Sequence, residues 1–90
     1  MMPNDNSVYL AFVKIENMLD NFNIEYQSFN NRIEFFINNQ NQVIIDSSEN
    51  QISLFSMNNY HIFSLKSDNI WLSQTSDIDL FQFIEQLVRL

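Results

Sequence analysis

The sequence of 90 residues contains no cysteine and no glycine. The absence of cysteine excludes disulfides, a thiolate nucleophile and any zinc or iron–sulfur site built from cysteine. The absence of glycine excludes phosphate-binding loops of the Walker or dinucleotide type. Tight turns that need a positive φ must then use asparagine, the next most tolerant residue. We therefore expect Asn30-Asn31, Asn38-Asn39 and Asn58-Asn59 to replace glycine in hairpin turns.

Basic residues are also scarce: the chain has 4 Lys and Arg and 11 Asp and Glu, which gives a formal net charge of -7. A phosphate backbone would repel such a chain, so cations and basic protein surfaces are expected as partners and nucleic acid is not. No segment approaches the roughly 18 apolar residues of a membrane helix, so no membrane partner is expected. The N-terminal residues do not have the pattern of a secretory signal. We expect a bacterial cytoplasmic protein or, alternatively, a processed organellar form.

Two amphipathic segments lie near the two ends of the chain. The first predicts a helix over about residues 6–22, and the last predicts a helix that opens at Ser76, with Asp79 completing a capping box. In both segments the apolar residues recur at spacings of three and four, which places them on one helical face. These residues are Val8, Phe12, Ile15, Leu19 and Phe22 in the first segment and Phe81, Ile84, Leu87 and Val88 in the last.

The segments between the helices are short apolar runs separated by joints rich in Asn and Ser, which is typical of strands joined by hairpins. The expected strands are Ile24–Phe29, Arg32–Asn38, Gln42–Ser47, Gln51–Phe55, Tyr60–Leu65 and Asn69–Ser73. Two helices bury their apolar faces best against one face of a single sheet. The predicted fold is therefore α+β, a two-layer sandwich with two terminal helices on an antiparallel sheet of about six strands, in one domain over residues 1–90.

Three carboxylates are the candidates for binding chemistry. Glu16 and Asp20 stand four residues apart, on one face of the first helix, and Glu25 follows at the start of the first strand. They could form a shallow oxygen-ligand site for a hard cation, or simply an ordinary solvated acidic face. His61 is the only histidine, which excludes a His-rich metal site, and no Ser or Thr stands in a recognisable nucleophile setting. Trp71 is expected in the core. We expect no enzymatic activity.

The ordered set of segments resembles the frataxin family, especially its bacterial members of the CyaY type, from about Ser7 to Leu87. The segment IENMLDNF resembles the acidic end of the family's first helix, and Ile24-Glu25 the start of its first strand. QVIID, QISLFS and YHIFSL resemble the third, fourth and fifth strands. Trp71 and IDLFQFIEQL resemble the late tryptophan and the closing helix.

The resemblance implies an accessory and regulatory protein of iron–sulfur cluster assembly. Such a protein binds iron (Fe2+ or Fe3+) weakly through surface carboxylates, and it associates with a cysteine desulfurase and an iron–sulfur scaffold protein. The implied metal ligands are Glu16, Asp20 and Glu25. The implied partner-binding residues are Glu16 and Asp20 on the helix and Gln51, Ser53 and Tyr60 on the sheet. The alternative is a generic acidic interaction module, such as an inhibitor or a nucleic-acid mimic, without a metal function.

The sequence also departs from the family pattern. Ser53 stands where the fourth strand usually carries a surface tryptophan, and Phe55 is expected to point to the opposite face of the sheet. Asn17, Asn21 and Asn23 occupy positions where acidic residues are common. We therefore expect weaker iron binding than in the family, and a smaller contribution of the sheet to partner binding.

Overall fold

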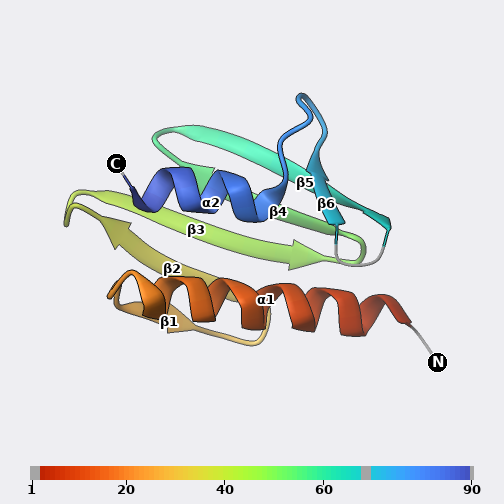
Figure 1. Ribbon diagram of the computed structural model, residues 1–90, viewed down its shortest axis with the longest axis horizontal. Coiled ribbons are helices and arrows are strands. Elements are labelled where there is room, and N and C mark those ends of the chain that lie inside the picture. Colours follow the sequence, from red (N-terminus) through yellow and green to blue (C-terminus); the bar gives the residue numbers. More distant parts are fainter. Residues whose placement is uncertain (1–2, 68–69, 90) are drawn as a thin grey trace.

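The structure is a computed structural model that describes residues 3–67 and 70–89. Both helices lie on the same side of a six-stranded antiparallel sheet, whose strands follow one another in chain order (Figure 1). The elements are α1 Pro3–Asn21, β1 Tyr26–Ser28, β2 Arg32–Ile37, β3 Asn41–Ser48, β4 Gln51–Ser56, β5 Asn59–Ser67, β6 Ile70–Ser73 and α2 Leu80–Val88. The predicted α+β sandwich is confirmed. Asn69, the predicted first residue of the last strand, lies outside the described residues.

The core lies between the helices and the inner face of the sheet. The predicted helical faces are confirmed, because α1 and α2 both bury the residues that the spacing selected: Phe12, Ile15, Leu19, Phe81, Ile84 and Leu87. Trp71 is also confirmed as a core residue, with 0% of its surface exposed. Its indole Nε1 is buried without a hydrogen-bond partner within the described part of the chain. Trp71 therefore stabilises the core by packing.

The end of α1 is a Schellman motif built without glycine. Asn23 adopts the left-handed conformation with a φ of 60°. The amide of Asn23 donates to the carbonyl of Asp20 at 3.0 Å, and the amide of Ile24 donates to the carbonyl of Leu19 at 2.9 Å. These bonds satisfy carbonyls that the helix end would leave unpaired. The chain turns here and returns as β1, which begins at Tyr26 rather than at the predicted Ile24.

The two helices begin at other residues than predicted. Helix α1 begins earlier, at Pro3, because the fixed φ of proline suits the first helical position and its missing N–H needs no partner there. Helix α2 begins later, at Leu80, and Ser76 is not its cap. The Ser73 amide donates to the Ile78 carbonyl at 3.0 Å, which holds the chain before α2 against the edge of β6. Asp79 is the N-cap instead, and its carboxylate accepts from the Phe81 amide at 2.9 Å.

The hairpin turns confirm part of the prediction for asparagine. Asn38 and Asn39 have φ values of 58° and 60°, and Asn58 has 66°. The prediction is wrong for Asn30-Asn31, where neither residue has a positive φ; this bend is closed instead by a hydrogen bond from the Phe29 amide to the Arg32 carbonyl, at 2.7 Å. It is also wrong for Asn59, since Met57 supplies the other positive φ of its turn, at 50°.

No helix within residues 3–67 and 70–89 is long and apolar enough to cross a membrane.

Candidate functional site

The first candidate surface is the acidic edge, formed by Glu16 and Asp20 on α1 and Glu25 before β1. The Schellman motif brings these residues near one another by turning the chain directly after the helix. Strand β1 is an edge strand and runs beside α1, as the hydrogen bond from the Ser28 hydroxyl to the Glu16 carboxylate shows, at 2.7 Å. One oxygen of Glu16 is thus already engaged with the sheet.

Tyr26 of β1 connects the acidic edge to the core. Its side chain is half-buried and packs against the core cluster. Desolvation, followed by the negative charges of Asp20 and Glu16, raises the pKa of the Tyr26 phenol above its usual value of 10.0. The two carboxylates of α1 therefore act on one phenol, although the sequence alone did not indicate this contact.

One further carboxylate, which was not predicted from the sequence, lies on the same hollow as Asp20 and Glu25. They line an open hollow together with Tyr26, Glu34 and Phe36. The register of β1 with β2 pairs Gln27 with Glu34, so Glu34 reaches the hollow from the side of the sheet that the helices do not cover, where its carboxylate contacts Arg32. Only the strand register could have identified Glu34, because it lies nine residues beyond Glu25 in the sequence.

The acidic edge is open and consists of separate carboxylates. In residues 3–67 and 70–89, no three His, Cys, Asp or Glu side chains are grouped so that they could hold a metal ion together. Asp20 and Glu25 are exposed and Glu16 is half-buried. The assignment of Glu16, Asp20 and Glu25 as metal ligands stays a prediction.

The second candidate surface is the open face of the sheet, which the helices do not cover. The strand register places the predicted residues Gln51, Ser53 and Tyr60 on this face. Phe55 lies there too, because it is two residues from Ser53 and pairs with Tyr60. The prediction that Phe55 points to the opposite face is therefore wrong. The rings of Phe55 and Tyr60 lie 5.0 Å apart, centre to centre.

The open face is more apolar than the solvent-facing side of an antiparallel sheet usually is. Tyr60 is 72% exposed and Phe36 is 53% exposed. Cross-strand pairing and diagonal neighbours join the apolar side chains of this face into one band. The band consists of Phe36, Ile44, Phe55, Tyr60, Ile62 and Leu72. The band was not predicted from the sequence, because only the register of neighbouring strands brings its side chains together.

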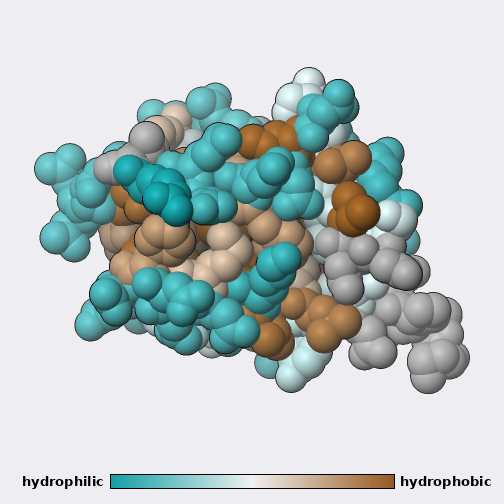
Figure 2. Space-filling model, in the orientation of Figure 1, coloured by the Kyte–Doolittle hydropathy of each residue, from teal (hydrophilic) through white to brown (hydrophobic). Residues whose placement is uncertain are grey.

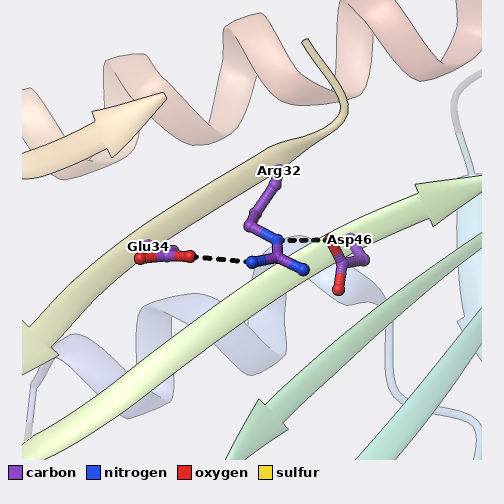
Figure 3. A network of polar contacts seen from close by, with 3 residues as sticks. All are labelled: Arg32, Glu34 and Asp46. Atoms are coloured by element: carbon purple, nitrogen blue, oxygen red, sulfur yellow. Dashed lines mark hydrogen bonds and ion pairs between the residues drawn. The ribbon is translucent and has the colours of Figure 1, made fainter. Parts of the chain in front are cut away.

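A small ion network lies at one end of the open face (Figure 3). The Arg32 guanidinium contacts the Asp46 carboxylate at 3.0 Å and the Glu34 carboxylate at 3.1 Å. These hydrogen bonds, the one to Asp46 first, raise the pKa of Arg32. Because one cation faces two carboxylates, the network leaves a net negative charge at the rim of the apolar band.

The comparisons with known proteins bear on the fold. No protein-family model and no curated protein sequence matches this chain. Among solved structures, the chain is similar to a frataxin from Psychromonas ingrahamii of the CyaY protein family. The similarity has a TM-score of 0.77 and 18% sequence identity, and it covers 92% of this chain and 85% of that chain. The resemblance predicted from the sequence is therefore confirmed at the level of three-dimensional structure: the chain has the frataxin fold.

Proposed function

We propose that this protein is an accessory and regulatory protein of iron–sulfur cluster assembly, rather than an enzyme. The combination of the frataxin fold with an acidic edge at the end of α1 carries the proposal. In this role the protein binds iron weakly through Glu16, Asp20 and Glu25, and docks on a cysteine desulfurase and its scaffold protein. The role would place it in the bacterial cytoplasm or in an organelle that assembles clusters.

Iron binding at the acidic edge would be loose because its carboxylates are mostly exposed and hydrated. Hard cations prefer such oxygen ligands. Asp20 and Glu25 also line an open hollow, in which a hydrated ion could approach both carboxylates. The hydrogen bond from Ser28 competes with a cation for Glu16.

Docking on the desulfurase would use the acidic edge, and docking on the scaffold would use the open face of the sheet. Carboxylates on the edge favour a basic partner surface and raise the rate of association. On the open face, Phe55 and Tyr60 form an aromatic pair beside Ser53 and Gln51. Aromatic side chains are frequent anchors of interfaces, so this pair supplies part of the contact area that Ser53 cannot.

A titration with Fe2+ under anaerobic conditions, followed by NMR, tests the metal function. Amide signals around Glu16, Asp20 and Glu25 should shift, and the shifts should weaken as salt is added. Glu16→Gln with Asp20→Asn should reduce them, whereas Glu49→Gln, in the exposed turn between β3 and β4, should not. Strongest shifts at His61 or at α2 would contradict the assignment.

A binding measurement with a purified cysteine desulfurase tests the partner. The affinity should fall as the ionic strength rises, because the interaction is between opposite charges. Absence of binding at low salt would contradict the proposed role in cluster assembly, whereas the similarity to the frataxin fold would remain.

A further inference from the structure

The outward surface of α1 changes character along the helix. The N-terminal half exposes Tyr9 and Leu10, which are 66% and 49% exposed, next to the half-buried Val13. The C-terminal half carries Glu16 and Asp20. Figure 2 shows patches of hydrophobic colour along the middle of this helix and hydrophilic colour over its last part. These five residues together are the α1 outer surface.

The apolar residues of the α1 outer surface are not needed for the core. Tyr9, Val13, Glu16 and Asp20 follow one another at spacings of four, three and four, so they form one line along the helix. The core-facing stripe, which contains the fully buried Ile15, is a separate side of the same helix. Folding therefore does not account for the exposed tyrosine and its apolar neighbours.

Charge on the α1 outer surface has one sign. Within residues 7–21 of α1, Lys14 carries the positive charge. Its Nζ lies 4.3 Å from the ring centre of Phe81 in α2. Lys14 is thus turned toward the other helix, away from the line that Glu16 and Asp20 continue. A complementary surface would be apolar over the first half of α1 and basic over the second.

We propose that the α1 outer surface docks an amphipathic basic segment of a partner protein. Apolar side chains of the segment cover Tyr9, Leu10 and Val13, while its Lys or Arg side chains meet Glu16 and Asp20. A second copy of this chain does not fit, because each copy has a net charge of -7 and would bring the same carboxylates. The inference rests on the proposed function where the partner is the cysteine desulfurase, and it adds an apolar anchor to the acidic edge.

Two paired variants separate the apolar from the electrostatic contribution. Tyr9→Ser with Leu10→Gln should weaken binding of purified cysteine desulfurase by about tenfold, with the salt dependence of the affinity unchanged. Glu16→Gln with Asp20→Asn should weaken binding and also flatten its salt dependence. Met57→Ser is the control, because Met57 is 44% exposed but lies in the turn between β4 and β5. Thermal unfolding of each variant verifies that the fold is retained.

A second probe separates this inference from the proposed function. The probe is a synthetic amphipathic peptide of leucine and lysine, with amide shifts of Tyr9, Leu10, Glu16 and Asp20 as the readout. Peptide binding there without desulfurase binding would support the docking surface and overturn the cluster-assembly role. Desulfurase binding that Tyr9→Ser with Leu10→Gln leaves unchanged would overturn the inference and retain the role. Absence of shifts along α1 with either probe would overturn both.

Discussion

The hydroxyl of Ser28 on β1 donates a hydrogen bond of 2.7 Å to the carboxylate of Glu16 on α1, 12 residues earlier in the sequence. This bond fixes one carboxylate of the acidic edge against the sheet. It also means that Glu16 has a partner before any cation arrives. The same contact therefore affects both stability and metal binding.

Replacing Ser28 with alanine should lower the free energy of unfolding by about 0.5–1.5 kcal/mol, because one hydrogen bond at an exposed position is lost. The released Glu16 oxygen should bind cations more tightly, so its amide shift should reach saturation at a lower iron concentration. Urea unfolding and the NMR titration measure the two effects. Ser48→Ala, at an exposed strand position, should change neither. If Ser28→Ala had the stability and the iron response of the wild type, the hydrogen bond would contribute neither to folding nor to cation binding in solution.

The end of α1 predicts an unusual ranking of substitutions at position 23. Asn23 has a φ of 60°, a conformation that costs a residue with a Cβ about 1–2 kcal/mol and that glycine adopts freely. Asn23→Gly should retain or raise the stability, whereas Asn23→Ala should lower it by about 1 kcal/mol. Chemical denaturation of both variants measures the difference. Equal stabilities would mean that the chain leaves α1 by another route.

The helical contribution to the core can be tested at two positions with 0% exposure. Leu19→Ala and Ile84→Ala should each cost about 2–5 kcal/mol, because each leaves a cavity among residues that cannot fully close around it. Leu10→Ala is the matched control on the same helix, and at 49% exposure it should change the stability by less than about 1 kcal/mol. Small losses at both core positions would show that the helical faces are assigned incorrectly.

The phenol of Tyr26 reports on the negative charge of the acidic edge. Burial is the larger cause of its raised pKa and the charges of Asp20 and Glu16 are the smaller ones. Asp20→Asn should therefore lower the pKa of Tyr26 only part of the way toward 10.0, whereas Asp46→Asn should leave it unchanged. The phenolate absorbance, compared with that of Tyr26→Phe, measures this titration.

The raised pKa also determines a pH dependence of stability. The folded protein holds the Tyr26 proton more tightly than the unfolded chain does. The contribution of Tyr26 to stability is therefore fully present below pH 10.0, the usual pKa of a tyrosine. This contribution is lost as the pH rises through the higher pKa that Tyr26 has in the folded state. Tyr26→Phe should lose less stability than the wild type over that range. An identical pH profile for the two proteins would contradict the shift.

The open face of the sheet allows a gain-of-binding experiment. Ser53→Trp should leave the fold intact, because position 53 lies on the uncovered side, and it should tighten binding to a conventional scaffold or desulfurase. Tyr60→Ser should weaken binding, because Tyr60 is 72% exposed and its ring packs at a tilt against Phe55. Surface plasmon resonance at two salt concentrations measures both effects. Unchanged binding of both variants would exclude this face from the interface.

The fold could be predicted because the spacing of apolar residues differs between helices and strands and can be read from the sequence. Phe12, Ile15 and Leu19, for example, recur at the spacing of one helical face. The start of α2 could not be predicted, because Ser76 and Asp79 are both good N-cap residues. The backbone hydrogen bond from Ser73 to Ile78 decides between them. Local patterns describe propensities, whereas such pairings depend on tertiary structure.

The candidate site was predicted less completely, for the same physical reason. Glu16, Asp20 and Glu25 could be selected as neighbours in sequence, but only the register of β1 with β2 places Glu34 on the hollow that Asp20 and Glu25 line. The face on which Phe55 lies could have been predicted, because side chains alternate between the two faces along a strand and Phe55 is two residues from Ser53. The prediction that Phe55 points to the opposite face was nevertheless wrong.

The two edges of the sheet have a consequence for polymerisation. Edge strands with free amides and carbonyls can template the addition of further chains and start fibrils. Here the outer side of β6 is paired at Leu72 and Ser73 with the segment before α2, and β1 is only three residues long and lies next to the charges of Glu16 and Glu25. Growth by strand addition is thus blocked at both ends, so concentrated solutions of the folded protein should resist amyloid seeding even though the sheet carries an exposed apolar band.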